Sequence, residues 1–325
     1  MAEQAHSINW QGLLDLPDPV KERAAKAIGR TIGVPWSSEI EETAVVLAQF
    51  ASGEKVDEKL GVEVLKVVEA DQAVLGRASS RMLSEAVLTQ SNREIIAAMA
   101  ADQLLTGADA RDASEGQVEE GWLLTFAARA ERTVDPVMRR VWAACLAQEI
   151  LHPGAISTSL LATLSKLGQR ELGLINKYAS LIISSDFIPV DESDLGQLKS
   201  LFHLQSLGFV SGAGTPFRRQ GKLDEDGVFW VPVGDEALVV QGKAGQDWSL
   251  GGVFASDNLL ALAKVLDIQP QREALINIAR QFFRLDWKKE VMRAKWTRDG
   301  DRVSFEAIEI YHKEPPQGAV VEKVG

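Results

Sequence analysis

The chain has 325 residues, of which 46% are apolar and 6% aromatic, and its formal net charge is −11. This acidic balance argues against a protein that coats nucleic acid, because phosphate binding requires clustered Lys and Arg, although one local basic patch remains compatible with it. Cys145 is the single cysteine, which excludes an internal disulfide and a cysteine-based zinc site and favours a reducing compartment.

Neither end of the chain nor its interior carries a membrane signal. The start, Met1-Ala2-Glu3-Gln4, lacks the basic and apolar regions of a secretion signal. No apolar run approaches the roughly 20 residues that a bilayer span requires. We therefore expect a cytoplasmic protein without a membrane span, and the many Ala and Leu residues predict a mainly α fold with a smaller α+β part.

Helices dominate the first region, 1–110. Asp18-Pro19 is typical of an N-cap followed by proline at the first helical position, and Ser37 or Ser38 can cap a further helix. A long helix is predicted over 83–105, and the small and polar residues 106–117 predict a loop.

The second region, 111–185, contains the clearest pattern. Asp135-Pro136 repeats the cap signal, and one apolar helix face follows, ending in a carboxylate: Met138, Val141, Trp142, Cys145, Leu146 and Glu149. Pro153-Gly154 ends this helix, and Ser157 lies at or near the cap of the next one. We expect the two helices to pack as an antiparallel pair across the turn.

Glu149 stands where the pattern calls for an apolar residue. A buried carboxylate needs partners, and the start of the next helix offers free N–H groups and the positive end of a dipole. Arg139, Arg140 or Lys166 can add charge. We interpret Glu149 as a structural cap or a member of a buried ion pair, and a catalytic acid is the alternative.

The third region, 186–325, mixes helices and strands. A short helix over 195–207 leads into a strand, and Gly234-Asp235 lies between two β-rich runs as in a hairpin. Helices are predicted over 256–268 and 272–283. A second hairpin is predicted about Asp299-Gly300, because Gly accepts the positive φ that a two-residue turn requires.

The order of helix, loop and hairpin in this region is that of a winged helix. Four basic residues would then be candidates for nucleic-acid contacts, one in the helix and three in the wing: Lys199, Arg218, Arg219 and Lys222. The helix is poor in basic residues, however. A winged-helix-like packing or dimerisation module is the main interpretation, because a fold does not imply a function.

Motifs for catalysis or cofactors do not emerge from the sequence. The histidines His6, His152, His203 and His312 are dispersed, so we expect no metal site. Phosphate-binding and dinucleotide-binding loops and a nucleophile elbow are not found, and we expect no cofactor. Asp15, Asp18, Glu22 and Lys26 resemble a nuclease set only superficially, because they surround a helix cap.

The central segment resembles a bacterial family, the domain of unknown function 2806 family. The resemblance covers residues 85–210 and rests on a tryptophan-containing helix, a Pro-Gly turn and a leucine-rich helix. The matching positions are Asn92, Trp122, Trp142, Leu146, Ala147, Glu149, Pro153, Gly154, Ser157, Leu161, Leu164 and Leu167. The family implies no established chemistry. The helix pair also resembles, over a shorter stretch, the abortive-infection alpha proteins, which implies phage defence.

These observations favour a non-enzymatic interaction or regulatory protein, as part of a phage-defence system, with a protein partner or a second copy of itself. Trp122, Trp142, Glu149, Pro153, Gly154 and Ser157 would form its structural motif. A winged-helix DNA-binding regulator is the first alternative. An enzyme whose site forms from residues distant in the sequence is the second.

Overall fold

The computed structural model describes residues 8–13, 15–32, 72–106, 113–191, 194–215, 217–285, 290–299 and 302–311. The chain forms two compact units, Met1–Lys166 and Leu167–Gly325. Residues of the expected region 111–185 therefore occur in both units. The predicted combination of helices with a smaller β part is confirmed as a mixed α+β fold with two antiparallel sheets.

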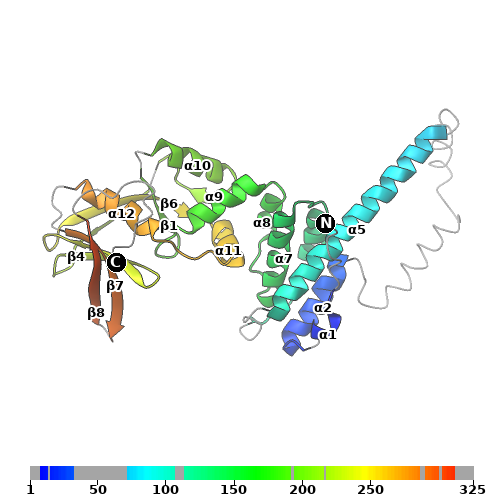
Figure 1. Ribbon diagram of the computed structural model, residues 1–325, viewed down its shortest axis with the longest axis horizontal. Helices are drawn as coiled ribbons and strands as arrows, with labels where there is room; N and C mark the ends of the chain where they lie inside the picture. The colour runs from blue at the N-terminus through cyan, green and yellow to red at the C-terminus, as the bar shows by residue number, and fades with distance from the viewer. Residues whose placement is uncertain are drawn as a thin grey trace. The chain divides into compact units, whose positions relative to one another are not determined.

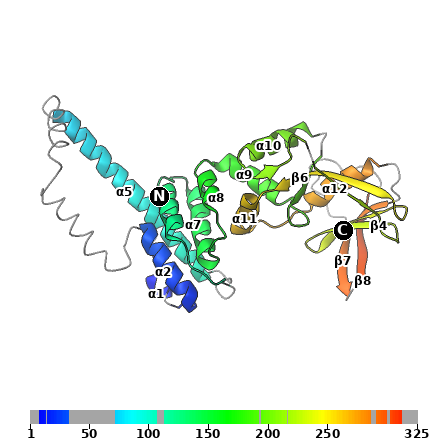
Figure 2. The same cartoon turned by 180° about the vertical axis from the view of Figure 1, so that it is seen from behind.

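The described part of the first unit consists of helices and their connections. The helices are α1 (Trp10–Leu13), α2 (Asp18–Ile32), α5 (Gln72–Thr106), α6 (Glu120–Ala130), α7 (Pro136–Leu151) and α8 (Thr158–Leu164). Figures 1 and 2 show α5 running past α2 and α7, and these are its principal packing partners. The further helix predicted after Ser37 or Ser38 lies outside the described residues.

The cap signals at Asp135 and Ser157 produce the expected helix starts, whereas α2 already begins at Asp18, the expected N-cap, whose side chain pairs with Lys21. Asp135 Oδ1 accepts hydrogen bonds from the N–H groups of Val137 and Met138, both at 2.9 Å, and Pro136 opens α7. Ser157 Oγ accepts from the N–H of Leu160 at 3.0 Å and caps α8. Each bond satisfies a donor that the helix itself leaves unpaired.

The core of the first unit lies between α2, α5, α6 and α7. Its largest fully buried side chains include Ile28, Ile96, Phe126, Trp142 and Leu146. Burial of a side chain of this size stabilises a fold by roughly 1.5–3 kcal/mol. Cys145 belongs to the same buried face and is closed to solvent, in agreement with its helical spacing.

The sequence predicted that α8 packs mainly against α7, and this prediction is wrong. α8 packs principally against α6. Trp122 of α6 donates a hydrogen bond to the carbonyl of Ile156 just before α8, at 2.6 Å, and Arg129 of α6 donates to Ser165 just after it, at 3.3 Å. These two bonds hold both ends of α8 to α6. Helical periodicity alone does not predict which helix α8 contacts.

Polar side chains fasten α5 to the connection between α6 and α7. Asn92 of α5 is fully buried, and its Nδ2 donates to the carbonyl of Glu131 at 2.7 Å. Its Oδ1 accepts from Arg139 Nη2 at 2.6 Å, and Arg139 Nε donates to the carbonyl of Thr133 at 3.2 Å. Arg93 adds an ion pair with the Glu131 side chain. Side chains therefore satisfy two carbonyls of the α6–α7 connection, those of Glu131 and Thr133.

The second unit combines helices with two sheets. Its helices are α9 (Gln169–Ala179), α10 (Leu195–Ser206), α11 (Asp257–Val265) and α12 (Glu273–Phe283). Its strands are β1 (Phe187–Pro189), β2 (Val210–Ser211), β3 (Phe217–Lys222), β4 (Val228–Val233), β5 (Glu236–Gln241), β6 (Asp247–Ala255), β7 (Glu290–Asp299) and β8 (Arg302–Ile310).

The first sheet is organised around β6. Strand β1 pairs along one edge of β6, and β2 and β3 pair one after the other along the opposite edge, all antiparallel. β1 and β3 both meet β6 at Gly252. A Cβ atom at Gly252 would lie 2.3 Å from the Phe187 ring and 2.5 Å from the carbonyl oxygen of Ile188, so only glycine allows this crossing.

The second sheet has the order β4-β5-β7-β8 and contains both predicted hairpins. β4 and β5 join at Gly234, which has a φ of +63°, and β7 pairs with β8 up to Asp299 opposite Arg302. Residues 300 and 301 of the second turn are outside the described residues. The Phe282 ring of α12 lies 5.1 Å from that of Phe229 in β4 and so ties the helix to the sheet.

Among the described helices, none combines the length and the apolar character that a bilayer crossing demands.

We expect Asn92→Leu to destabilise the first unit. Leu removes the donor for the Glu131 carbonyl and the acceptor for Arg139, and each buried group left without its partner costs on the order of 1–3 kcal/mol. Equilibrium unfolding in urea measures this loss. Ser91→Leu, at the exposed neighbouring position, is the matched control and should change the unfolding free energy by less than about 0.5 kcal/mol. Equal effects of the two variants would contradict the assigned role of Asn92.

Candidate functional site

The turn between α7 and α8 is built around the Glu149 carboxylate. Glu149 is 2% exposed, near the end of α7. Its Oε1 accepts from the N–H of Gly154 at 2.7 Å, and its Oε2 accepts from the N–H of Ile156 at 2.9 Å. The donors belong to the turn itself, and the first turn of α8 is left to Ser157. Glu149 therefore closes the turn that precedes the helix.

Trp122 completes the same arrangement from the other side. Its Nε1 donates to the carbonyl of Ile156, a residue that is 1% exposed. Trp122 and Glu149 together therefore satisfy both the carbonyl and the N–H of Ile156. The Trp122 ring stacks on Phe126 at 5.1 Å, and Phe126 meets Trp142 edge-on at 5.4 Å. The motif residues Trp122, Trp142 and Glu149 thus lie in one buried cluster at the turn.

Burial governs the electrostatics of this cluster. Desolvation raises the pKa of Glu149 above its ordinary value, and the neighbouring Glu119 raises it further, while the backbone N–H groups of the turn act in the opposite direction. Desolvation, assisted by Glu149, raises the pKa of the Cys145 thiol to about 12. Both oxygens of Glu149 already accept from backbone donors, which favours the structural interpretation over a catalytic acid.

The expected charge partner Arg139 lies elsewhere. Its guanidinium binds Asn92 and the carbonyl of Thr133. Pro153 and Gly154 occupy the turn, and Gly154 has a φ of +87°, which non-glycine residues rarely adopt. His152 ends α7 as its C-cap residue, and its N–H donates to the carbonyl of Gln148 at 2.8 Å. Within the described residues, no three His, Cys, Asp or Glu side chains gather as a metal site would require.

Sequence reasoning missed Arg23 of α2, which lies behind the same turn. Arg23 is 5% exposed, and its Nη1 donates to the carbonyl of Ser114 at 2.7 Å. The N–H of Ser114 in turn donates to the carbonyl of Leu151 at 3.0 Å. One signal was present: Arg23 follows Val20 by three residues and precedes Ala27 by four, so it shares their buried helix face.

The basic residues proposed for nucleic-acid contact do not form one cluster. Lys199 is exposed on α10, and Arg218 and Lys222 are exposed on β3. Arg219 points to the other face of β3, where it pairs with Asp186 at 2.9 Å and lies 4.6 Å above the Phe187 ring. The three arginine and lysine residues assigned to the wing thus lie in a strand paired with β6, and Arg219 has a structural partner.

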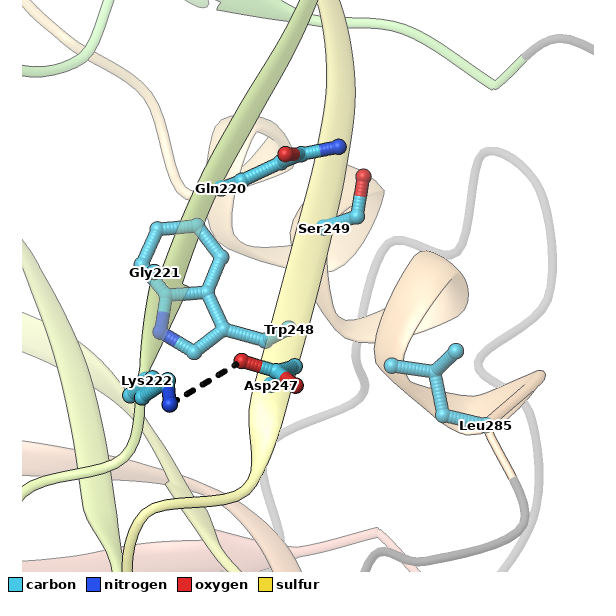
Figure 3. A pocket seen from close by; sticks show the side chains of 7 residues that line it. All are labelled: Gln220, Gly221, Lys222, Asp247, Trp248, Ser249 and Leu285. Atoms are coloured by element: carbon cyan, nitrogen blue, oxygen red, sulfur yellow. Dashed lines mark ion pairs between the residues drawn. The ribbon is translucent and has the colours of Figure 1, made fainter.

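A surface pocket of about 460 Å³ lies beside β3 and β6 and includes Lys222 in its wall. Figure 3 shows the Trp248 ring next to Gly221, with Lys222 facing Asp247. A Cβ atom at Gly221 would lie 2.6 Å from that ring, so glycine makes room for the tryptophan. Lys222 Nζ and Asp247 Oδ1 are 3.9 Å apart and their side chains are 70% and 82% exposed, so this pair contributes little to stability.

We expect Glu149→Leu to destabilise the chain more than Glu149→Gln does. Gln retains one acceptor oxygen for the N–H groups of Gly154 and Ile156, whereas Leu retains none, and a buried donor without an acceptor costs on the order of 1–3 kcal/mol. Thermal melts of the two variants and the wild type measure the order. A Leu variant as stable as the wild type would refute the turn-closing role. Two stable variants that both lose a measured activity would support the catalytic interpretation.

Comparison with known proteins finds a similarity, and it covers this cluster. No curated protein and no solved structure matches the chain significantly. Residues 76–207 match the model of a family described as "Protein of unknown function (DUF2806)". This range contains Asn92, Trp122, Trp142 and Glu149, and the resemblance drawn from the Trp, Glu and Pro-Gly pattern is confirmed. The similarity to this family of unknown function is therefore shown for residues 76–207.

Proposed function

We propose that the chain is a non-enzymatic interaction protein and that its second unit holds a partner through the outer face of α10. The observation that carries this proposal is the exposure of large apolar side chains there. Leu195 is 78% exposed and Phe202 is 49% exposed. They are separated by seven residues, or two helical turns, so they lie on one face of the helix.

Phe217 of β3 extends this apolar surface beyond the helix. Phe217 is 47% exposed. The loop before β3 lies against both rings, because a Cβ atom at Gly214 would be 3.6 Å from the Phe202 ring and one at Gly212 would be 2.5 Å from the Phe217 ring. Leu195, Phe202 and Phe217 are called the apolar patch below. Exposed apolar groups that cluster in this way mark interaction sites.

The charge beside the apolar patch indicates the chemistry of the partner. Lys199 is exposed on α10 between Leu195 and Phe202, at positions four and three residues from them. A cation at this place favours a partner segment that presents apolar side chains flanked by carboxylates, as an amphipathic acidic helix does. A second group of exposed apolar side chains, on α5 about Met82 and Leu83, follows a stretch outside the described residues, so the proposal rests on α10.

The arrangement of the first sheet supports a winged-helix-like packing module. β6 lies between β1 and β2, and α10 leads directly to β2. In such modules the helix before the second strand is the one that contacts a partner. The short resemblance to abortive-infection alpha proteins supports the further proposal that this contact serves phage defence.

DNA binding is the second candidate function, favoured by one observation. Arg218 and Lys222 are exposed on β3 and are separated by an even number of residues, so they face the same side of the strand. In the described residues β3 pairs with β6 along one edge. α10, however, exposes two large apolar side chains, Leu195 and Phe202, beside Lys199, which suits a protein partner better than the polar major groove.

We expect Leu195→Ser/Phe202→Ser to lose the partner. The wild-type chain, the double variant and the control Ile308→Ser are used as baits in extracts of native cells, with capture quantified by mass spectrometry. Ile308 is 42% exposed on β8 of the same unit, so the control also removes exposed apolar surface, although from one residue and not two. A specific partner should fall by about tenfold or more with the double variant, because a few central apolar residues carry most interface energy.

The control must keep the partner, and circular dichroism must show both variants folded. Sedimentation of the purified chain identifies a second copy of itself as the partner if the double variant alone becomes monomeric. Capture that is equal for all three baits would refute the role of the apolar patch.

If the chain binds nucleic acid, we expect the exposed cations Arg218 and Lys222 to contact the phosphates. Arg218→Ala/Lys222→Ala should weaken binding to duplex DNA and lower the slope of log affinity against log salt by about 0.9 for each phosphate that is no longer neutralised. Lys243→Ala/Lys264→Ala removes two exposed cations elsewhere in the same unit and is the matched control. Fluorescence anisotropy over a salt series measures both. An unchanged slope, or a wild type that does not bind at low salt, would remove DNA from consideration.

A further inference from the structure

A small cavity in the first unit contains an incompletely satisfied arginine. The cavity has a volume of about 160 Å³ and lies between α2 and the segment that leads to α6. Its lining residues are Pro19, Glu22, Arg23, Lys26 and Ala27 from α2 and Gly116, Gln117 and Val118 from the segment. Two of these residues are cationic and one is anionic.

The hydrogen bonds of Arg23 leave one edge of its guanidinium unused. Nη1 donates to the carbonyls of Ser114 at 2.7 Å and Gly116 at 3.4 Å. Nε and Nη2 are buried and have no hydrogen-bond partner. A buried donor without an acceptor is costly, and more so when it carries charge. Burial also lowers the pKa of Arg23, because desolvation disfavours the cation.

The unused edge is the one that recognises oxyanions. Nε–H and Nη2–H point in parallel and together bind a carboxylate or phosphate. Elsewhere in this unit the same edge is used in this way, because Nε and Nη2 of Arg93 both donate to Glu131. The two carbonyls on Nη1 hold the Arg23 guanidinium in place without neutralising its charge.

We propose that this cavity binds the oxyanion group of a small ligand, a phosphate or a carboxylate, between Arg23 and Lys26. Arg23 supplies the paired donors and Lys26 a second positive charge. Glu22 is exposed and opposes the anion, so it limits the affinity. The donors of Arg23 lie beneath the surface, and the long side chains of Glu22 and Lys26 in the cavity wall must shift as the anion enters.

The experiment titrates the full chain with sodium phosphate and, separately, with sodium acetate. Sodium chloride at equal ionic strength is the reference. Melting temperature and the amide NMR signals of the first unit are recorded. A saturable rise in melting temperature, with shifts at Gly116, Gln117 and Val118, is the expected result. A response to phosphate alone or to acetate alone identifies which oxyanion the cavity takes.

Variants make the assignment specific. Arg23→Met should abolish the saturable response. Lys26→Met leaves the backbone contacts of Arg23 intact and should weaken the apparent Kd by about tenfold, whereas Glu22→Gln should tighten it by about threefold, because one charge near the anion is removed in each case. Lys21→Met is the matched control: Lys21 pairs with Asp18 and does not line the cavity. It should respond as the wild type does.

The Lys26 and Glu22 variants keep the test decisive even if Arg23→Met fails to fold. Opposite changes in the apparent Kd for these two variants, with no change for Lys21→Met, would support the site. The absence of a saturable response to both anions, or an equal response in Lys26→Met, Glu22→Gln and the wild type, would overturn it.

Discussion

The first unit depends on how one residue, Ile156, satisfies its backbone. Ile156 is buried just before α8, where neither its N–H nor its carbonyl has a partner within a helix. Glu149 of α7 accepts from the N–H, and Trp122 of α6 donates to the carbonyl. A buried backbone group without a partner costs on the order of 1–3 kcal/mol. This is a sizeable fraction of the roughly 5–15 kcal/mol by which a folded domain is stable. The two side chains therefore decide where the chain can turn.

The same principle recurs at the connection between α6 and α7. Asn92 and Arg139 supply the buried donors and acceptors there, while Arg93 and Glu131 add charge. In both places neighbouring helices send polar side chains to a short connection, so the connections are ordered without forming regular structure. Asn92, Trp122 and Glu149 all lie within residues 76–207, the range that matches the family model.

Local signals predicted local structure well. Asp135-Pro136, Ser157 and Gly234 each act within a few residues, and each gave the expected helix start or hairpin. The partners of Trp122, Arg139 and Arg23 lie 34, 47 and 91 residues away in the sequence. The spacing of apolar residues along a helix does not reveal contacts between residues so far apart in the sequence. For this reason the packing of α8 on α6 was missed, as was the preference of Arg139 for Asn92 over Glu149.

The cavity at Arg23 and the turn at Glu149 are parts of one connected structure. The carbonyl of Ser114 accepts from Arg23, and the N–H of the same residue donates to the carbonyl of Leu151, near the end of α7. Two residues further on, Gly116 approaches Pro153 of the turn: a Cβ atom there would lie 3.6 Å from the proline ring. An anion that neutralises Arg23 would strengthen one end of this chain of contacts. The segment 114–116 would then be held more firmly against the turn, so that binding of the proposed anion and the stability of the turn would be thermodynamically linked.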